Sequence, residues 1–316
     1  MSRPSSIFSS ERANSFSLVV LLLGGLLAMA LAGIGYVGVQ SGLAGQRERQ
    51  LLDSRLARVD SPGFSARLVF VGDSTLGNAI DESLFSRLAG LPAANLALNA
   101  AFGLAGTANM IERAARHPSV ETVVVFQALD IAIRPPSPLG DLQTRLGDRS
   151  LADRLASARA YFDWSTVHAT LAQLWLAAQG RATPAAMTGD YIRQDPDPAA
   201  LQREIDRNRR RPLRPEAILP DSRRDLARIA AICRQHGLRC LYAHGPMLDE
   251  ICSVSGRYIA ALNDVVAGVG LERVTGTPLC LPRDDLGDTV DHVSPRLRGW
   301  SSEEYYRLLA PRLAQR

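Results

Sequence analysis

Leu-Val-Phe-Val-Gly-Asp-Ser, at residues 68–74, predicts a buried strand that ends in a sharp turn. The first four residues are apolar and mostly branched or aromatic, as in strands that are covered on both faces. Glycine and aspartate break the run, and residues 80–88 predict the start of a helix. Ser74 then lies at the tip of the turn, where helix N–H groups and the helix dipole stabilise developing negative charge. A serine there suits nucleophilic chemistry, and the alternative is that Ser74 or Asp73 is only a helix N-cap.

Strand and helix patterns alternate along the rest of the chain. Strands are expected at 94–98, 122–126 and 238–243, helices at 107–116, 222–236, 255–269 and 303–313, and a loop at 279–293. This alternation is typical of a parallel sheet covered by helices, so we predict a three-layer α/β/α domain over residues 66–316. Sites in such sheets lie at the carboxyl ends of the strands, where Ser74, Asn99 and Gln127 fall.

Residues 134–219 interrupt this alternation and predict a mostly helical insertion. Within it, residues 151–178 have the pattern of amphipathic helices and carry Trp164 and Trp175. We expect both tryptophans to pack in the core of the insertion, with stacking on sugar rings as the alternative.

Residues 18–39 carry no charge and are rich in leucine, alanine, glycine and valine. At 1.5 Å per residue such a run spans a hydrocarbon core of about 30 Å. We therefore expect an uncleaved transmembrane anchor, after a disordered tail at 1–17 and before a juxtamembrane linker or helix at 40–65. Arginines stand on both sides of the span, so the charge pattern leaves its orientation open.

Composition narrows the class of protein. The net charge of +4 is small for 316 residues, so no nucleic-acid partner is expected. The four cysteines contain no C-x-x-C pair, and we expect neither a metal site nor a cofactor. Cys252 and Cys280 look like loop positions that would pair outside the cytoplasm, whereas Cys233 and Cys240 are expected to be buried free thiols.

A second chemical motif, Gly-Asp-Thr-Val-Asp-His-Val-Ser-Pro, occupies residues 287–295. It contains His292 together with Asp288 and Asp291. A serine at the end of the first strand and this loop supply a nucleophile, a base and a carboxylate that orients the base. The two segments would have to meet over one edge of the sheet.

In this order and spacing, the chain resembles the SGNH (GDSL-like) family of esterases and acyltransferases. The matching pieces are residues 72–74, 95–99 and 288–299. The resemblance implies Ser74 as nucleophile, His292 as general base and an aspartate as its orienting partner. The family has this aspartate three residues before the histidine, where the chain has Thr289. We therefore expect Asp288 to orient the base, with Asp291 as the alternative.

The resemblance also implies oxyanion donors after the second and third strands. The glycine of the family corresponds to Ala100, and its asparagine falls in residues 127–130, which contain no asparagine. The expected oxyanion or substrate-binding residues are therefore Ala100, Asn99, Gln127 and Asp73. Loss of one oxyanion donor typically costs about 10²–10³ in rate, so we expect a rearranged or weak site.

An anchor ahead of such a domain resembles the extracytoplasmic members of the family, including the D-alanyl transfer protein of teichoic acid modification. This implies a single-pass protein of the cytoplasmic membrane, with its N-terminus inside and its catalytic domain in the periplasm. It also implies an acylated glycan or small acyl ester as substrate and a membrane-bound O-acyltransferase as partner. The alternative is a non-catalytic accessory subunit that binds a membrane partner through the span. A cytoplasmic enzyme with a membrane tether is a third hypothesis.

Overall fold

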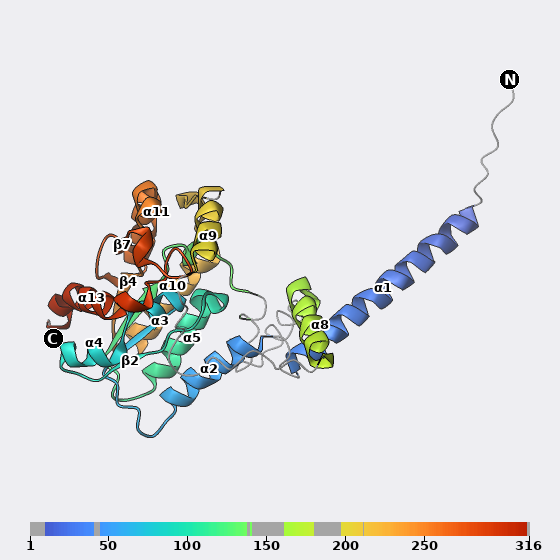
Figure 1. Ribbon diagram of the computed structural model, residues 1–316. Coiled ribbons are helices and arrows are strands. Elements are labelled where there is room, and N and C mark those ends of the chain that lie inside the picture. The colour runs from blue at the N-terminus through green and yellow to red at the C-terminus, as the bar shows by residue number, and fades with distance from the viewer. Residues whose placement is uncertain are drawn as a thin grey trace. The chain divides into compact units, whose positions relative to one another are not determined.

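The computed structural model describes residues 10–40, 45–137, 140, 161–179, 197–210 and 212–314. The chain divides into two compact units, residues 1–46 with 145–184 and residues 47–144 with 185–316. The smaller unit contains helix α1, Ser10–Gln40, and helix α8, Trp164–Ala178. The larger unit is an α/β domain (Figure 1).

A five-stranded parallel sheet, in the order β2-β1-β3-β4-β6, forms the centre of the larger unit. The strands are β1 (Leu68–Gly72), β2 (Ala93–Asn95), β3 (Thr122–Gln127), β4 (Arg239–His244) and β6 (Glu272–Arg273). All of β1 is buried, as are β3 and β4 beyond their first residues, because helices cover both faces. This is a common doubly wound strand order, and the predicted α/β class with a central parallel sheet is confirmed.

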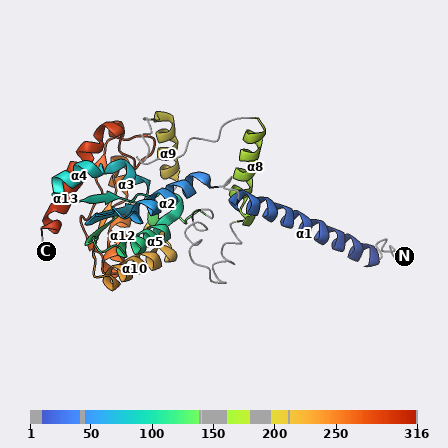
Figure 2. The same cartoon turned by 90° about the horizontal axis from the view of Figure 1, so that it is seen from below.

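Helices flank the sheet on its two faces (Figure 2). Helices α5 (Gly103–Ala115) and α10 (Pro220–Gln235) pack together on one face, and α4 (Glu82–Ala89) packs with α13 (Arg298–Leu313) on the other. The larger unit also contains α3 (Ser74–Ala79), α9 (Pro198–Arg210), α11 (Asp249–Val254), α12 (Gly256–Gly268) and the short parallel pair β5 (Met247–Leu248) and β7 (Cys280–Leu281).

The α/β unit begins earlier in the chain than residue 66. Helix α2, Gln46–Val59, contributes Leu51 and Val59 to the buried core. The guanidinium of Arg55 on the same helix donates to the carbonyl of Ala97 at 3.1 Å and is buried there. Residues 47–65 therefore belong to the domain, where the sequence predicted a linker or juxtamembrane helix.

Other element boundaries also differ from the sequence-based expectation. Helix α1 begins at Ser10, so residues 10–17 are helical where a disordered tail was expected, and residues 1–9 lie outside the described residues. Residues 16–39 of this helix are long and apolar enough to cross a membrane. The two-residue strand β6 was not predicted, because its sequence has no strand-like hydrophobic pattern. Helix α13 starts at Arg298, ahead of the expected residue 303.

The helical insertion divides between the two units. Helix α8 belongs with α1, whereas α9 belongs with the α/β domain. Residues 151–160 of the expected amphipathic segment lie outside the described residues. Trp164 is 67% exposed and Trp175 is 59% exposed, so the expectation that both pack in a core is wrong.

Two disulfides involve all four cysteines. Cys252 of α11 is bonded to Cys280 of β7, as predicted. Cys233 and Cys240, expected to be free thiols, are bonded to each other. Helix α10 turns into β4 at Gly237, which has a φ of 63°, and this tight connection brings the two Cα atoms to 6.1 Å, within disulfide range.

Gly72 closes β1 where the strand lies against β3. A Cβ added to Gly72 would lie 1.7 Å from the carbonyl oxygen of Phe126, which is fixed in the sheet. Gly72→Ala should therefore lower the free energy of unfolding by about 1–3 kcal/mol, as overpacking of cores does. Gly256→Ala is the matched control, because no atom lies within 4 Å of its added Cβ. Equal thermal midpoints for the two variants would contradict this packing.

Candidate active site

Ser74 is the first residue of α3, directly after the end of β1. Asp73 holds this turn, since its Oδ1 accepts the Thr75 N–H and its Oδ2 accepts the Ala128 N–H, both at 3.0 Å. Asp73 is 2% exposed, and these two bonds brace the carboxyl ends of β1 and β3. Its role as helix N-cap is confirmed, and a role in substrate binding stays a prediction.

His292 lies in the loop that precedes α13 and is hydrogen-bonded to a carboxylate. Its Nδ1 is 2.9 Å from Oδ1 of Asp288, and its Nε2 is 4.0 Å from Oδ1 of Asp291. The backbone holds the loop closed, because the N–H of Gly287 donates to the carbonyl of His292 at 2.8 Å. Asp288 is therefore the carboxylate that fixes the orientation of the ring, and Asp291 lies toward its other nitrogen.

The serine turn and the histidine loop meet, although they are far apart in the sequence. The hydroxyl of Thr75 donates to Oδ2 of Asp291 at 3.2 Å across a sequence separation of 216 residues. Thr289 donates to Oδ1 of the same carboxylate at 2.6 Å. Neighbours of Ser74 and His292 are thus bonded to each other. Within the described residues the Ser74 hydroxyl makes no hydrogen bond to His292, and such catalytic contacts often tighten only when substrate binds.

The electrostatics of the loop favour a charged imidazole. Burial alone would lower the pKa of His292, but the hydrogen bond to Asp288 and the carboxylates of Asp291 and Asp73 outweigh it. The pKa of His292 therefore lies above the ordinary 6.5. Burial would raise the pKa of Asp291, yet His292 and Arg134 more than offset this, and the pKa of Asp291 is lowered. Burial and then the carboxylate of Asp291 raise the pKa of Asp73 to about 6.

An ion pair that the sequence analysis missed completes the charged cluster. Asp130 and Arg134 are paired just beyond the carboxyl end of β3, and Asp130 is 5% exposed. The guanidinium of Arg134 acts on the carboxylates of Asp73, Asp130 and Asp291. The available signal was the spacing of four residues between an acid and a base after the third strand. Within the described residues, no group of three or more metal-binding side chains is placed to hold a metal ion.

The expected oxyanion donors differ in their burial and hydrogen bonding. Gln127 is fully buried, and its amide donates to the hydroxyl of Thr107 on α5 at 2.7 Å, so this amide group is already engaged inside the domain. Asn99 is half-buried in the loop that follows β2, and its Oδ1 accepts the N–H of Ala101 at 3.0 Å. This leaves the amide nitrogen, the donor end, without a hydrogen bond within the described residues. Ala100 is also half-buried, at the start of the following short 3₁₀ turn.

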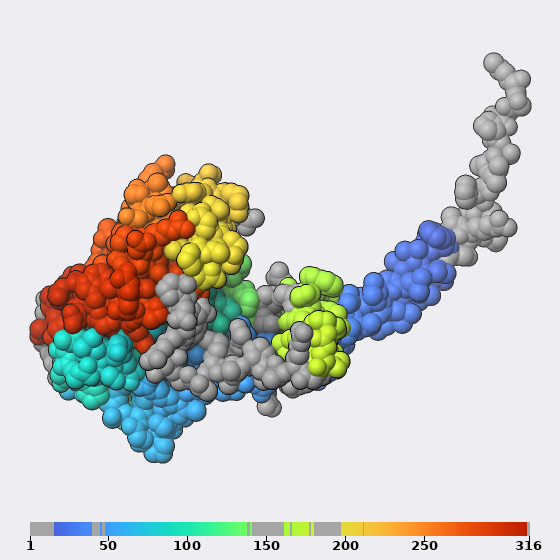
Figure 3. All heavy atoms as spheres, in the orientation of Figure 1, coloured from blue at the N-terminus to red at the C-terminus, as the bar shows by residue number. Residues whose placement is uncertain are grey.

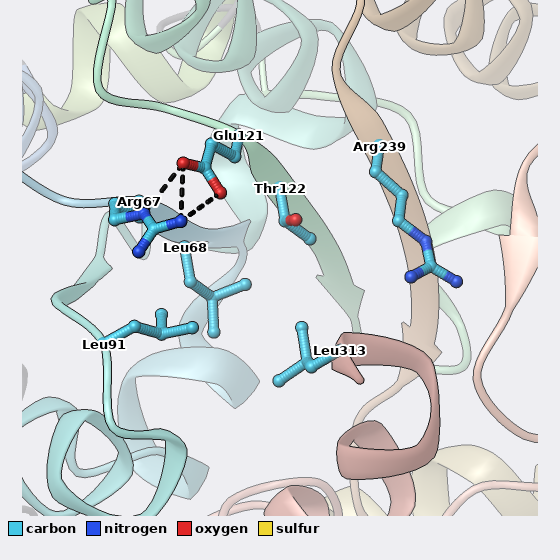
Figure 4. Close-up of a pocket in the computed structure, with 7 residues that line it drawn as sticks. All are labelled: Arg67, Leu68, Leu91, Glu121, Thr122, Arg239 and Leu313. Atoms are coloured by element: carbon cyan, nitrogen blue, oxygen red, sulfur yellow. Dashed lines mark hydrogen bonds and ion pairs between the residues drawn. The ribbon is translucent and has the colours of Figure 1, made fainter. Parts of the chain in front are cut away.

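A cavity of about 270 Å³ lies at the opposite edge of the sheet (Figure 4). It is lined by the residues that begin β1, β3 and β4, among them Arg67, Glu121 and Arg239. Arg67 and Glu121 form an ion pair on one side of it. Because ligands of such sheets bind at the carboxyl ends of the strands, this cavity at the amino ends is separate from the candidate site.

No protein-family model matches the chain, and neither a curated protein nor a solved structure shows a significant match to it.

The raised pKa of His292 can be tested directly. Asp288→Asn removes the anion at Nδ1 while keeping the size of the side chain, so the pKa of His292 should fall. An NMR titration of the imidazole carbon-bound protons measures this, with His292→Gln assigning the signal. The exposed Asp284 in the same loop provides the control, because Asp284→Asn should leave the titration unchanged. A fall in pKa only with Asp291→Asn would assign the orienting role to Asp291.

Proposed function

We propose that this chain is a membrane-anchored serine esterase or O-acyltransferase of the SGNH type, acting on acyl groups of cell-envelope glycans. The observation that carries the proposal is the hydrogen bond between Thr75 and Asp291, which brings the Ser74 turn to the loop of His292. The hydrogen bond from His292 to Asp288 adds the orienting carboxylate of a nucleophile–base–acid arrangement.

In the proposed reaction, Nε2 of His292 accepts the proton of Ser74 as Oγ attacks the ester carbonyl. The tetrahedral intermediate collapses, the alcohol leaves with the proton from His292, and an acyl-enzyme on Ser74 remains. Water or a glycan hydroxyl then attacks the acyl carbon, His292 takes its proton, and Ser74 regains its own. The amide of Asn99 and the backbone N–H groups of Ser74 and Ala100 are the proposed donors to the oxyanion.

The two carboxylates beside the ring support the general-base role. Proton transfer from Ser74 creates an imidazolium, and the charges of Asp288 and Asp291 stabilise it. Because the pKa of His292 is raised, the free base forms only as the pH rises through that pKa. Activity should therefore increase with pH through a value above 6.5 and fall off on the acid side.

The anchor and the disulfides support an extracytoplasmic site of action. Helix α1 is long and apolar enough to cross a membrane, and both cysteine pairs are oxidised. Structural disulfides are rare in the cytosol and persist in the periplasm and outside the cell. We propose a single-pass protein with its N-terminus in the cytoplasm, its α/β domain in the periplasm, and a membrane-bound O-acyltransferase as a partner.

A second candidate is a catalytically inactive accessory subunit of such a system. It is favoured by the position of Gln127, which is buried against Thr107 instead of serving the third-strand oxyanion position. The side of the ring that would receive the Ser74 proton also faces Asp291. In that case the domain would hold a partner or a glycan without forming an acyl-enzyme.

Labelling of the detergent-solubilised full chain by a fluorophosphonate probe decides between the two candidates. The probe should label Ser74, Ser74→Ala should abolish labelling, and His292→Ala should slow it by about 10²–10⁴. The exposed Ser253 gives the matched control, since Ser253→Ala should label normally. If the wild-type chain unfolds cooperatively on heating, and is therefore folded, yet is not labelled, this result would contradict the enzyme and support the accessory subunit.

The acceptor separates hydrolase from transferase once labelling is seen. Release of a chromogenic alcohol in water alone identifies an esterase, because water resolves the acyl-enzyme. If the alcohol is released slowly in water and faster after a glycan is added, the enzyme is a transferase.

A further inference from the structure

Helix α8 exposes most of its large apolar side chains, whereas two threonines and Val167 are its buried residues. Thr166 and Thr170 are buried, and the Thr170 hydroxyl donates to the carbonyl of Thr166 at 2.8 Å. The side chains of the α8 outer face, defined here as Trp164, His168, Leu171, Leu174 and Trp175, are all exposed. In water a helix normally hides its apolar stripe and exposes its polar one, so this pattern indicates an apolar surrounding.

The buried side of α8 packs closely on the end of the apolar helix α1. A Cβ added to Gly38 would lie 1.8 Å from Oγ1 of Thr170, and one added to Gly35 would lie 2.2 Å from the carbonyl oxygen of Tyr161. The rings of Tyr36 and Tyr161 meet edge to face at 5.4 Å. Small residues that allow such close approach, and threonines at the contact, are typical of helix pairs within membranes.

Length and composition determine how α8 could meet a bilayer. Its 15 residues contain no Asp, Glu, Lys or Arg, and at 1.5 Å per residue they extend about 22 Å, short of the roughly 30 Å of a hydrocarbon core. Tryptophan is the residue most characteristic of the boundary between headgroups and acyl chains, and α8 carries one near each end. An uncharged helix too short to span, with tryptophans on its outer face, fits this boundary.

We propose that α8 is a second membrane-contacting element, which lies against the end of α1 with its outer face in the lipid interface. Helix α8 is coloured yellow-green in Figure 3, and Trp164 at 67% and Trp175 at 59% are among its most exposed side chains. Lipid is the occupant we assign, because α8 is packed on the one described helix that is long and apolar enough to cross a membrane. The proposal rests on α1 as an anchor and is independent of the chemistry proposed for Ser74.

Quenching of tryptophan fluorescence by brominated lipids tests the proposal on the full chain in lipid bilayers. The three tryptophans, Trp164, Trp175 and Trp300, allow variants that each keep one and replace the other two by phenylalanine. Trp164 and Trp175 should have blue-shifted emission and lose most of it to lipids brominated near the headgroup end of the chains. Trp300, on α13 of the α/β domain, is the matched control and should keep its emission.

A fourth variant separates failure of this proposal from failure of the anchor. Leu23→Trp, in a background with the three native tryptophans replaced, places a single reporter on the exposed surface of α1. Quenching of that α1 reporter without quenching of Trp164 and Trp175 would overturn the α8 proposal and retain the anchor. Absence of quenching at all of these positions would overturn both. Quenching of the α1 reporter, Trp164 and Trp175, but not of Trp300, supports both.

Discussion

The hydrogen bond from Thr75 to the carboxylate of Asp291 is the contact on which the candidate site depends. Asp291 is buried, and a buried carboxylate is costly unless donors and opposite charge surround it. Thr75 supplies a donor from the first helix after β1, and Thr289 supplies one from within the loop. The first of these ties the loop of His292 to the turn of Ser74 by a side-chain hydrogen bond.

The charged side chains around that hydrogen bond shift one another's pKa values, so they have to be considered together. Three buried carboxylates, of Asp73, Asp130 and Asp291, surround the guanidinium of Arg134, and His292 stands beside them. Burial raises the pKa of Asp73, so its charge opposes folding at neutral pH. The raised pKa of His292 has the opposite sign. Its stabilising contribution is present below pH 6.5 and is lost as the pH rises through the folded-state pKa. Buried titratable groups with pKa values shifted in this way cluster at functional sites.

Local patterns were sufficient to predict the frame of the domain. The branched and aromatic runs of β1 and β3 indicate buried strands, and the turn at Gly72 places Ser74 at their carboxyl edge. The proximity of Asp288 to His292 follows from a spacing of four residues in one loop. What the sequence could not provide was the direction of side chains in three dimensions. Gln127 lies at the expected strand end, yet its side chain is hydrogen-bonded to Thr107. Cys233 is bonded to Cys240 because the turn at Gly237 brings the end of α10 close to the start of β4.

The tryptophans of α8 show a different limit of sequence reasoning. An amphipathic period reveals that a helix has two faces, but it does not reveal whether the apolar face meets a protein core or a lipid. Burial of Thr166 and Thr170 with exposure of Trp164 and Trp175 decides that question only once the packing against α1 is known.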